Sequence, residues 1–236
     1  MSSARAESLK ILVPIAAALL VAFFLACLAS WLSLIFTPVC GLLALAFGFT
    51  LYFFRDPERE TPDDPALLVA PADGLVTHVE VVDDAPFGLG RATRISVFLS
   101  VFDVHVNRFP FAGTVLESVH TPGLFLDARL VDCAVRNERM DWLLQTPKGK
   151  VAVRQIAGLI ARRIVGWVQP GEVVKTGQRL GLIRFGSRTD LFLPANCEAL
   201  VRVGDRVAGG LTPVARWIGT PTAFEQTLAA ATASRS

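Results

Sequence analysis

Gly186 and Ser187 form the only Gly-Ser pair in the 236 residues, and their order suits a reaction within the chain itself. A Gly leaves its carbonyl unshielded and tolerates a strained turn, and the Ser hydroxyl lies one covalent step from that carbonyl. Such a peptide bond can be attacked by its own hydroxyl, which would cut the chain. A Gly-Ser pair is also an ordinary turn dipeptide, and about one is expected by chance at this length. The prediction therefore depends on the surrounding residues.

A general base for Ser187 is available at the end of a strand-like run. His105 lies in the sequence Phe-Asp-Val-His-Val-Asn-Arg, residues 102–108, and Asp73 lies in a Pro-Ala-Asp-Gly turn, residues 71–74. An acid, a His and a Ser are the parts of a general-base arrangement that is recognised by roles rather than by chain order. Asp before Gly commonly only closes a turn, and isolated histidines are commonly structural. The three residues are therefore hypotheses at this point.

An internal repeat flanks the Gly-Ser pair. The pattern Gly-acid-x-Val-x-x-Gly occurs at residues 171–177 and again at residues 204–210, and each copy is typical of a tight turn between short strands. Two such halves around a central hairpin resemble the barrel-sandwich arrangement of biotinyl and lipoyl carrier domains, in which the hairpin holds a modified Lys. Here no Lys follows Lys175, and Gly186-Ser187 is predicted at the hairpin tip instead.

These residues must be positioned by a mainly β domain (α+β class), which we predict over residues 67–236 with a barrel-sandwich-like arrangement. Short β-rich runs bounded by Gly, Pro and Asp recur along it. Residues 159–167 suit either a strand or a short helix, and the polar, Ala-rich tail from Ala223 is predicted to be frayed. The predicted strands are residues 67–70, 75–82, 94–102, 113–119, 151–156 and the two runs that flank Gly186-Ser187.

Two uncharged apolar runs precede this domain, Ile11 to Phe36 and Val39 to Phe54, and Thr37-Pro38 separates them. The first is long enough to span about 30 Å of hydrocarbon, and the second, with about 16 residues, is marginal. Residues 1–54 are therefore predicted to form a membrane-anchoring helical hairpin. A charged, Pro-punctuated linker, residues 55–66, follows it.

Basic residues predict the side of the membrane. Arg5 and Lys10 precede the first run, Arg55 and Arg59 follow the second, and a hairpin brings all four to one side. By the positive-inside rule that side is cytoplasmic, so the predicted location is the inner cell membrane with the catalytic domain in the cytoplasm. A secretory or lipoprotein signal ending near Cys27 is the alternative, and the second apolar run argues against it.

Charge and cysteine usage exclude several classes of protein. A net charge of +2 excludes a strongly basic nucleic-acid binder. Cys27, Cys40, Cys133 and Cys197 stand apart, without the spacing of a disulfide framework or a zinc site. Free thiols and no metal are therefore expected.

Five ordered motifs resemble the short, membrane-anchored form of phosphatidylserine decarboxylase over nearly the whole chain after Arg55. The resemblance implies a proenzyme that cleaves itself at the Gly186-Ser187 bond. Ser187 then becomes an N-terminal pyruvoyl group, a built-in cofactor and the site of a Schiff base with the substrate amine. Pyridoxal phosphate is not expected, since none of the four Lys residues lies in a recognisable site. The motifs are Pro-Ala-Asp-Gly (71–74), Phe-Asp-Val-His-Val-Asn-Arg (102–108), Asn-Glu-Arg (137–139), Arg-Gln-Ile-Ala-Gly-Leu-Ile-Ala-Arg-Arg (154–163) and Phe-Gly-Ser-Arg (185–188).

The resemblance also implies roles for further residues. His105 would act as general base and acid, and Asp73 would orient it. Longer members of the family carry a second His where this chain has Arg108, so either His105 serves both self-cleavage and turnover or Arg108 takes an electrostatic role. Arg108, Arg162 and Arg163 are weak candidates for binding the lipid phosphodiester. Arg162 and Arg163 suit a solvated surface equally well.

The implied activity is that of a carboxy-lyase, which converts phosphatidylserine to phosphatidylethanolamine while the lipid stays in the membrane. The fragments 1–186 and 187–236 are expected to remain associated, and a homo-oligomer is left open. Two alternatives stay open as well. A non-enzymatic membrane-anchored adaptor would leave His105 and the Gly-Ser pair without roles, and a pyruvoyl decarboxylase of a soluble amino acid would not need two apolar runs.

Overall fold

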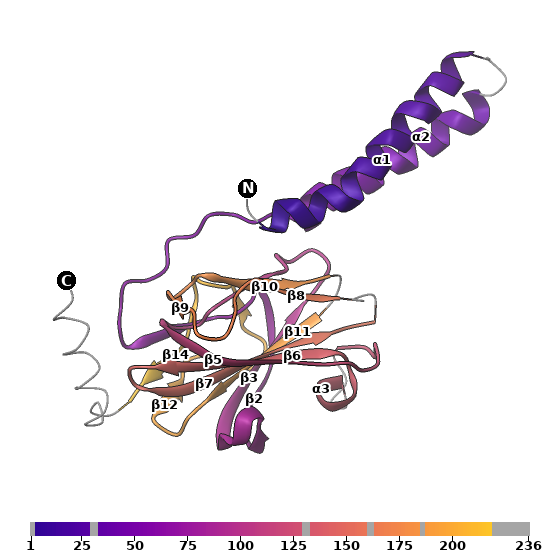
Figure 1. Ribbon diagram of the computed structural model, residues 1–236. Helices are drawn as coiled ribbons and strands as arrows, with labels where there is room; N and C mark the ends of the chain where they lie inside the picture. Colours follow the sequence, from indigo (N-terminus) through magenta and orange to yellow (C-terminus); the bar gives the residue numbers. More distant parts are fainter. Residues whose placement is uncertain (1–2, 29–32, 129–132, 160–162, 185–186, 219–236) are drawn as a thin grey trace. The chain divides into compact units, whose positions relative to one another are not determined.

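The chain divides into two compact units, Met1–Pro57 and Glu58–Ser236, and each is described by itself. Most of the segment predicted as a linker, residues 55–66, belongs to the second unit. The computed structural model describes residues 3–28, 33–128, 133–159, 163–184 and 187–218 (Figure 1).

The first unit contains two apolar helices, α1 (Ser3–Leu28) and α2 (Ser33–Phe53), and confirms the predicted helical hairpin. Stretches of 18 residues in α1 and 20 residues in α2 have mean hydropathies of 2.4 and 2.1. Helices of this length and composition can cross about 30 Å of hydrocarbon. Both are therefore compatible with membrane anchoring, including the second, which the sequence predicted to be marginal.

The turn of the hairpin does not lie at Thr37-Pro38, and that prediction is wrong. Both residues lie inside α2, and the first helix ends at Leu28 instead of Phe36. Pro is tolerated in apolar helices, where neighbouring groups satisfy the freed backbone carbonyl. A Pro in an apolar run therefore does not mark a turn by itself.

The second unit is built from strands and one short α-helix, α3 (Cys133–Arg136), and confirms the mainly β prediction. Residues 164–166 form a strand, which resolves the choice left open for residues 159–167, although residues 160–162 and the tail from Ala223 lie outside the described residues. The described strands are β1 (Leu67–Val69), β2 (Gly74–Ala85), β3 (Gly90–Leu99), β4 (Val106–Arg108), β5 (Gly113–Thr121), β6 (Arg139–Thr146), β7 (Gly149–Ala157), β8 (Ile164–Gly166), β9 (Val173–Val174), β10 (Arg179–Ile183), β11 (Ser187–Leu193), β12 (Cys197–Ala199), β13 (Arg206–Val207) and β14 (Pro213–Trp217).

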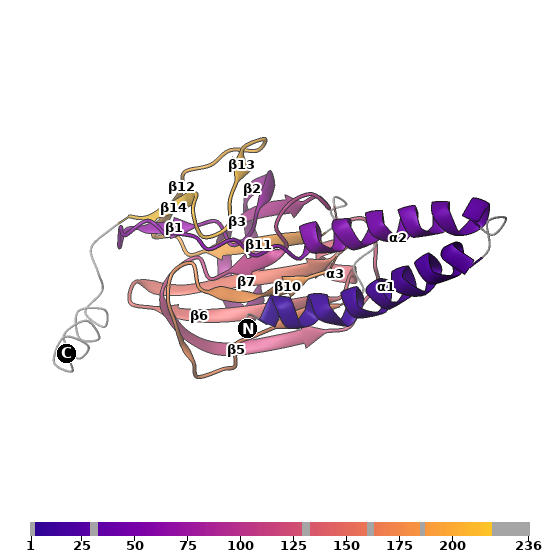
Figure 2. The ribbon, with the colours of Figure 1, turned by 90° about the horizontal axis from the view of Figure 1, so that it is seen from above.

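These strands form one large sheet and two small ones. The large sheet is curled and has the order β13-β2-β3-β11-β7-β6-β5-β9, and the small sheets have the orders β1-β14-β12 and β4-β10-β8. Figure 2 shows β5, β6, β7 and β11 side by side, with β3 and β2 beyond them. The strand β11 therefore lies in the interior of the large sheet, antiparallel to both of its neighbours, β3 and β7.

All seven residues of β11 are buried, so both faces of this strand are covered. Leu191 and Leu193 belong to the main hydrophobic core, and Phe192 packs with Ala85, Ala92 and others in a small cluster of its own. A strand buried on both faces does not alternate between apolar and polar residues. The sequence pattern could locate this strand but could not show its partners.

The two apolar runs around Gly186-Ser187 form strands, but they do not pair with each other. The strand β10 lies between β4 and β8 in a small sheet, whereas β11 belongs to the large sheet. The chain therefore passes from one sheet to another between Ile183 and Ser187. The predicted central hairpin with the Gly-Ser pair at its tip is wrong, because two adjacent apolar runs predict strands without specifying which strands they join.

The internal repeat is confirmed by backbone conformation. Each copy begins and ends with a Gly at positive φ, 94° and 73° at Gly171 and Gly177, and 99° and 78° at Gly204 and Gly210. Side chains with a Cβ rarely adopt this conformation, which explains the repeated Gly. Val173–Val174 of the first copy form β9 on β5, and Arg206–Val207 of the second copy form β13 on β2. The repeats thus close the two edges of the large sheet.

Candidate active site

Ser187 lies at one end of the large sheet, where it begins β11 between Leu99 of β3 and Ala157 of β7. It has an exposed fraction of 0%, and its Oγ has no hydrogen-bond partner among the described residues. A buried hydroxyl without a partner is unusual, because it has lost its hydrogen bonds to water. Gly186, the other residue of the predicted cleavage site, lies outside the described residues. The hydroxyl of Ser187 is thus buried and available to a reacting group.

His105 is fully buried between β3 and β4. Its Nδ1 lies 2.9 Å from the carbonyl oxygen of Asp103. A carbonyl can only accept, so Nδ1 donates, and in the neutral ring Nε2 is then unprotonated. The carbonyl oxygen of His105 accepts a hydrogen bond of 3.4 Å from the N–H of Ile183, at the end of the strand that precedes Ser187. His105 therefore lies beside the chain that leads into Ser187 and has the tautomer that a general base needs.

Asp103 holds the turn that orients His105, and sequence reasoning did not single it out. Its Oδ2 accepts hydrogen bonds from the N–H of Ser100 at 2.8 Å and from the Oγ of Ser100 at 2.7 Å. The N–H of Asp103 donates to the Ser100 carbonyl oxygen at 3.0 Å. This closed turn fixes the carbonyl that accepts from His105. The Ser-x-x-Asp spacing at residues 100–103 was the available signal.

The structure places the carboxylate of Asp73 on Arg59 and on the N–H of Gly209. Arg59 donates to both carboxylate oxygens, Nη1 to Oδ1 at 2.5 Å and Nη2 to Oδ2 at 2.8 Å. The N–H of Gly209 also donates to Oδ1, at 2.7 Å. In the described part of the chain one acceptor position on Oδ2 remains. A role of Asp73 in orienting His105 therefore stays a prediction, and Arg59 is a partner that the sequence did not reveal.

The turn that carries Asp73 has a second copy without an acid. Residues 70–76 and 109–115 both read x-Pro-x-x-Gly-x-Val, with Ala112 at the position of Asp73. The two copies are closed alike, since the N–H groups of their final Val residues donate to the backbone carbonyl oxygens of Asp205 and Glu172, both at 2.9 Å. A carboxylate is therefore not required to form this turn. A cavity of about 580 Å³ adjoins Ala112, at the end of the large sheet away from Ser187.

The structure describes two of the three Arg candidates, Arg108 and Arg163, and they differ in exposure. Arg108 is buried, its Nη1 donates to the carbonyl oxygen of Gly177 at 3.0 Å, and its N–H donates to Pro71 at 2.8 Å. Its side chain thus packs against the repeat loops, and contact with substrate stays a prediction. Arg163 is exposed, as expected both for a residue that binds the lipid phosphodiester and for a solvated surface charge. Arg162 lies outside the described residues.

A buried ion pair follows Ser187 on the same strand. Arg188 donates from Nε and Nη2 to the two carboxylate oxygens of Asp190, both at 2.7 Å, and both residues are buried. Cys133 lies beside this pair, 3.7 Å from Arg188 Nη1. Separating the two charges would cost several kcal/mol of free energy, because each would be left buried without its partner (about 3 to 5 kcal/mol). Sequence reasoning did not predict two charged residues inside the sheet.

The cysteines do not supply a nucleophile here. Cys133 and Cys197 are free and buried, as predicted. Burial raises the pKa of the Cys133 thiol and raises the pKa of the Cys197 thiol to about 12. Both are therefore thiols at neutral pH, and thiols are poor nucleophiles.

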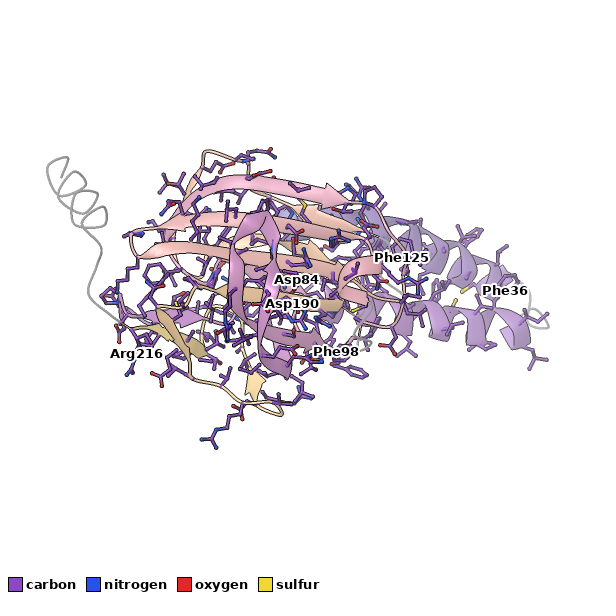
Figure 3. The ribbon with its side chains drawn as sticks, turned by 90° about the horizontal axis from the view of Figure 1, so that it is seen from below. Phe36, Asp84, Phe98, Phe125, Asp190 and Arg216 are labelled. Atoms are coloured by element: carbon purple, nitrogen blue, oxygen red, sulfur yellow. The ribbon has the colours of Figure 1, made fainter. Side chains whose placement is uncertain are left out.

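The groups that remain converge on one end of the large sheet. The strand β2 begins beside Asp73, and its residue Leu75 pairs with Phe98, next to Leu99 and Ser187. Figure 3 shows Phe98 toward this end and Arg216 toward the other. A buried hydroxyl, an imidazole whose Nε2 is unprotonated in the neutral ring and a carboxylate held by Arg59 are suited to base-assisted attack on a neighbouring carbonyl.

Comparison with known proteins covers this whole arrangement. A family model described as phosphatidylserine decarboxylase matches residues 46–215, from within α2 to within β14. A phosphatidylserine decarboxylase proenzyme of Desulfotalea psychrophila is 52% identical over 169 residues, 71% of this chain and 79% of the relative. Relatives of the same description from Pelobacter propionicus and Gluconacetobacter diazotrophicus are 49% and 53% identical over 177 and 176 residues. These cover 75% and 73% of this chain and 80% and 78% of the relatives.

Proposed function

The chain belongs to the phosphatidylserine decarboxylase family, and from this premise we propose that it acts through a pyruvoyl group made from its own Ser187. It is a carboxy-lyase, which removes the serine carboxylate of the lipid as CO2 and leaves an ethanolamine headgroup. Before it can act, the chain cuts itself between Gly186 and Ser187. The observation that supports this is the Ser187 Oγ, which is buried and has no hydrogen-bond partner among the described residues.

Self-cleavage begins when Nε2 of His105 takes the proton of the Ser187 hydroxyl. The oxygen attacks the Gly186 carbonyl carbon, so the acyl group moves from nitrogen to oxygen and the amide becomes an ester. Removal of the Cα proton of residue 187 then expels the Gly186 carboxylate and leaves dehydroalanine. Its imine tautomer takes up one water and releases ammonia, which leaves a ketone at position 187.

That ketone supplies the sink for the electrons released as CO2 departs. His105 takes a proton from the ammonium group of the substrate as its nitrogen becomes reactive, and gives a proton to the product carbon after CO2 has left. The closed turn of Ser100 and Asp103 keeps the His105 imidazole oriented in self-cleavage and in decarboxylation. The carbonyl oxygen of Asp103 accepts a hydrogen bond from Nδ1 whether the ring is neutral or protonated.

We expect the 1–186 and 187–236 fragments to stay together after the cut. The second fragment begins with β11, which pairs with β3 on one side and β7 on the other, and both of these strands belong to the first fragment. All seven residues of β11 are buried. Separation would therefore break two strand pairings and expose apolar surface to water.

We place the enzyme in the inner membrane with its catalytic unit on the cytoplasmic side. The helices α1 and α2 are long and apolar enough to span the bilayer, and a hairpin brings Lys10 and Arg55 to one side. An excess of basic residues marks the cytoplasmic side of a membrane protein. The anchor keeps the enzyme with a substrate that stays in the bilayer, and the exposed Arg163 is a candidate for contact with the phosphodiester.

Intact-mass analysis of the purified full chain tests the proposed cleavage. We expect two species, residues 1–186 and residues 187–236, the second lacking the α-amino group at its start. Ser187→Ala should remain one inactive chain, because Ala has no hydroxyl to attack or to eliminate. Ser96→Ala is the matched control, since Ser96 is also fully buried with an Oγ that has no described partner, and it should still cleave. A full-length species with unmodified Ser187 that decarboxylates lipid would refute the pyruvoyl proposal.

A further inference from the structure

Large apolar side chains are exposed around the end of the sheet where Ser187 lies. Phe102, Leu124, Val135 and Leu159 have exposed fractions of 65%, 47%, 67% and 70%, and we call this group the docking rim. We propose that the docking rim inserts into the headgroup region of the bilayer that holds the substrate. The inference rests on the proposed function, since it takes Ser187 as the reacting residue.

Strand directions place two members of the rim beside Ser187. The strands β3 and β7 are both antiparallel to β11, so both end where β11 begins. Ser187 pairs with the last residue of each, Leu99 and Ala157. Phe102 follows Leu99 by three residues, and Leu159 follows Ala157 by two. These two side chains therefore flank Ser187 from the two neighbouring strands.

The connection between β5 and β6 supplies the other two members at the same end. The strand β6 begins at Arg139, which pairs with Ile156, next to Ala157. Leu124 and Val135 lie in the chain that leads into β6, and the N–H of Leu124 donates to the carbonyl oxygen of Arg136 at 2.7 Å. Within the second unit, Figure 3 shows the neighbouring Phe125 toward the same end as Phe98.

The exposure of the rim is fixed by local structure. Phe102 lies in the turn that Asp103 closes with Ser100, and its N–H lies 3.4 Å from the Ser100 Oγ. Leu124 and Val135 belong to segments joined by a backbone bridge between Leu124 and Asn137. An apolar side chain held outward by a closed turn remains in water unless a partner covers it.

The charges around the rim fit an anionic lipid surface. Arg206 borders the Phe102 turn, 3.4 Å from Asp103, and its side chain is 72% exposed, whereas the carboxylate side chains of Asp103 and Glu138 are only 16% and 13% exposed. Arg163 and Arg136 are also exposed. Basic residues beside apolar ones are typical of surfaces that bind anionic bilayers.

At the opposite end, the exposed apolar residues of the large sheet lie on separate strands and next to acidic residues. Val81 on β2 precedes exposed Asp83 and Asp84, and Val173 on β9 follows exposed Glu172. A single exposed apolar residue is ordinary on a protein surface, whereas grouped ones mark an interaction site. A bilayer is the partner that fits, because phosphatidylserine is anionic, stays in the membrane and must bring its headgroup to a buried residue.

Turnover on two forms of the substrate tests the proposal in the full-length enzyme. Phe102→Ser combined with Leu159→Ser should lower CO2 release from phosphatidylserine vesicles at least tenfold. The same variant should keep its rate, within about twofold, on a short-chain phosphatidylserine dissolved as monomers. Val81→Ser combined with Val173→Ser is the matched control, since it removes two exposed apolar side chains at the opposite end of the sheet, and it should change neither rate.

Three outcomes would overturn the docking rim. They are an unchanged rate on vesicles, an equal loss on both substrates, and a change in the oligomeric state of the variant in detergent that accounts for its lost rate. The intact mass of the same samples tests the proposed function separately. An uncleaved but active parent enzyme would refute the pyruvoyl proposal, and the comparison of the two substrates would still test the docking rim.

Insertion can also be measured directly. Phe102→Trp in vesicles that contain brominated lipid should show quenching beyond that of the parent chain, whereas Val81→Trp should add none. Equal quenching at both positions, or none at residue 102, would contradict insertion of the rim.

Discussion

His105 is predicted to be the base of self-cleavage. Its surroundings allow a substitution that removes the basic nitrogen and largely keeps the packing of the side chain. General acid-base assistance is worth about 10²- to 10⁴-fold in rate, which corresponds to about 2.7 to 5.5 kcal/mol. His105→Ala removes the base but also leaves a hole in a fully buried site. His105→Asn is the sharper change, because its amide can still donate to the Asp103 carbonyl, 2.9 Å from Nδ1 in the parent, while nothing replaces the basic Nε2.

We therefore expect His105→Asn to slow self-cleavage by about 10²- to 10⁴-fold while the full chain still folds. Cleavage is followed by intact mass over time after synthesis, and folding by the thermal transition of uncleaved chain beside that of Ser187→Ala. Added imidazole should partly restore cleavage of His105→Ala, since it can enter the space left by the ring. Cleavage of His105→Asn at the parental rate would show that another group takes the Ser187 proton.

Deleting residues 1–54 should release a soluble unit that still self-cleaves, as seen by fractionation and intact mass, because the candidate residues all belong to the second unit; retention in the membrane fraction would refute the anchor. Asp190→Ala should lower the free energy of unfolding by about 3 to 5 kcal/mol, because Arg188 would be left buried without its partner; a loss below about 1 kcal/mol in chemical denaturation would contradict this. Asp73→Asn and Arg59→Ala should each slow self-cleavage by about ten- to a hundredfold, since hydrogen bonds between charged groups are worth about 1.5 to 3 kcal/mol. The double variant should be no slower than either, and fully additive defects would show that the two residues act separately.

Most elements of the fold were predictable because local patterns report them. Runs of β-rich residues between Gly and Pro located β2, β5 and β7, and repeated Gly at positive φ located the turns around β9 and β13. Partner choice was not predictable in the same way. The separation of β10 from β11 depends on contacts with strands far away in sequence, which no local pattern contains.

The candidate site was predicted in its residue types and missed in its contacts. Ser187 and His105 were identified from their neighbours in sequence, and both are fully buried. The contact of His105 with the Asp103 carbonyl was not predicted, because a main-chain acceptor leaves no signature in a sequence. In the sequence, Arg59 served only as one of the basic residues that predict the cytoplasmic side of the membrane. The structure shows that it binds Asp73.

The burial of β11 has a consequence for when the enzyme can become active. Ser187 is enclosed only when β11 lies between β3 and β7, so in our proposal the cut follows folding. Each molecule then makes its reactive group once, from its own backbone, and cannot exchange or recover it as an enzyme with a diffusible coenzyme can. Misfolded chains would not cleave and would stay inactive, so only correctly folded copies would alter the lipid composition of the cell.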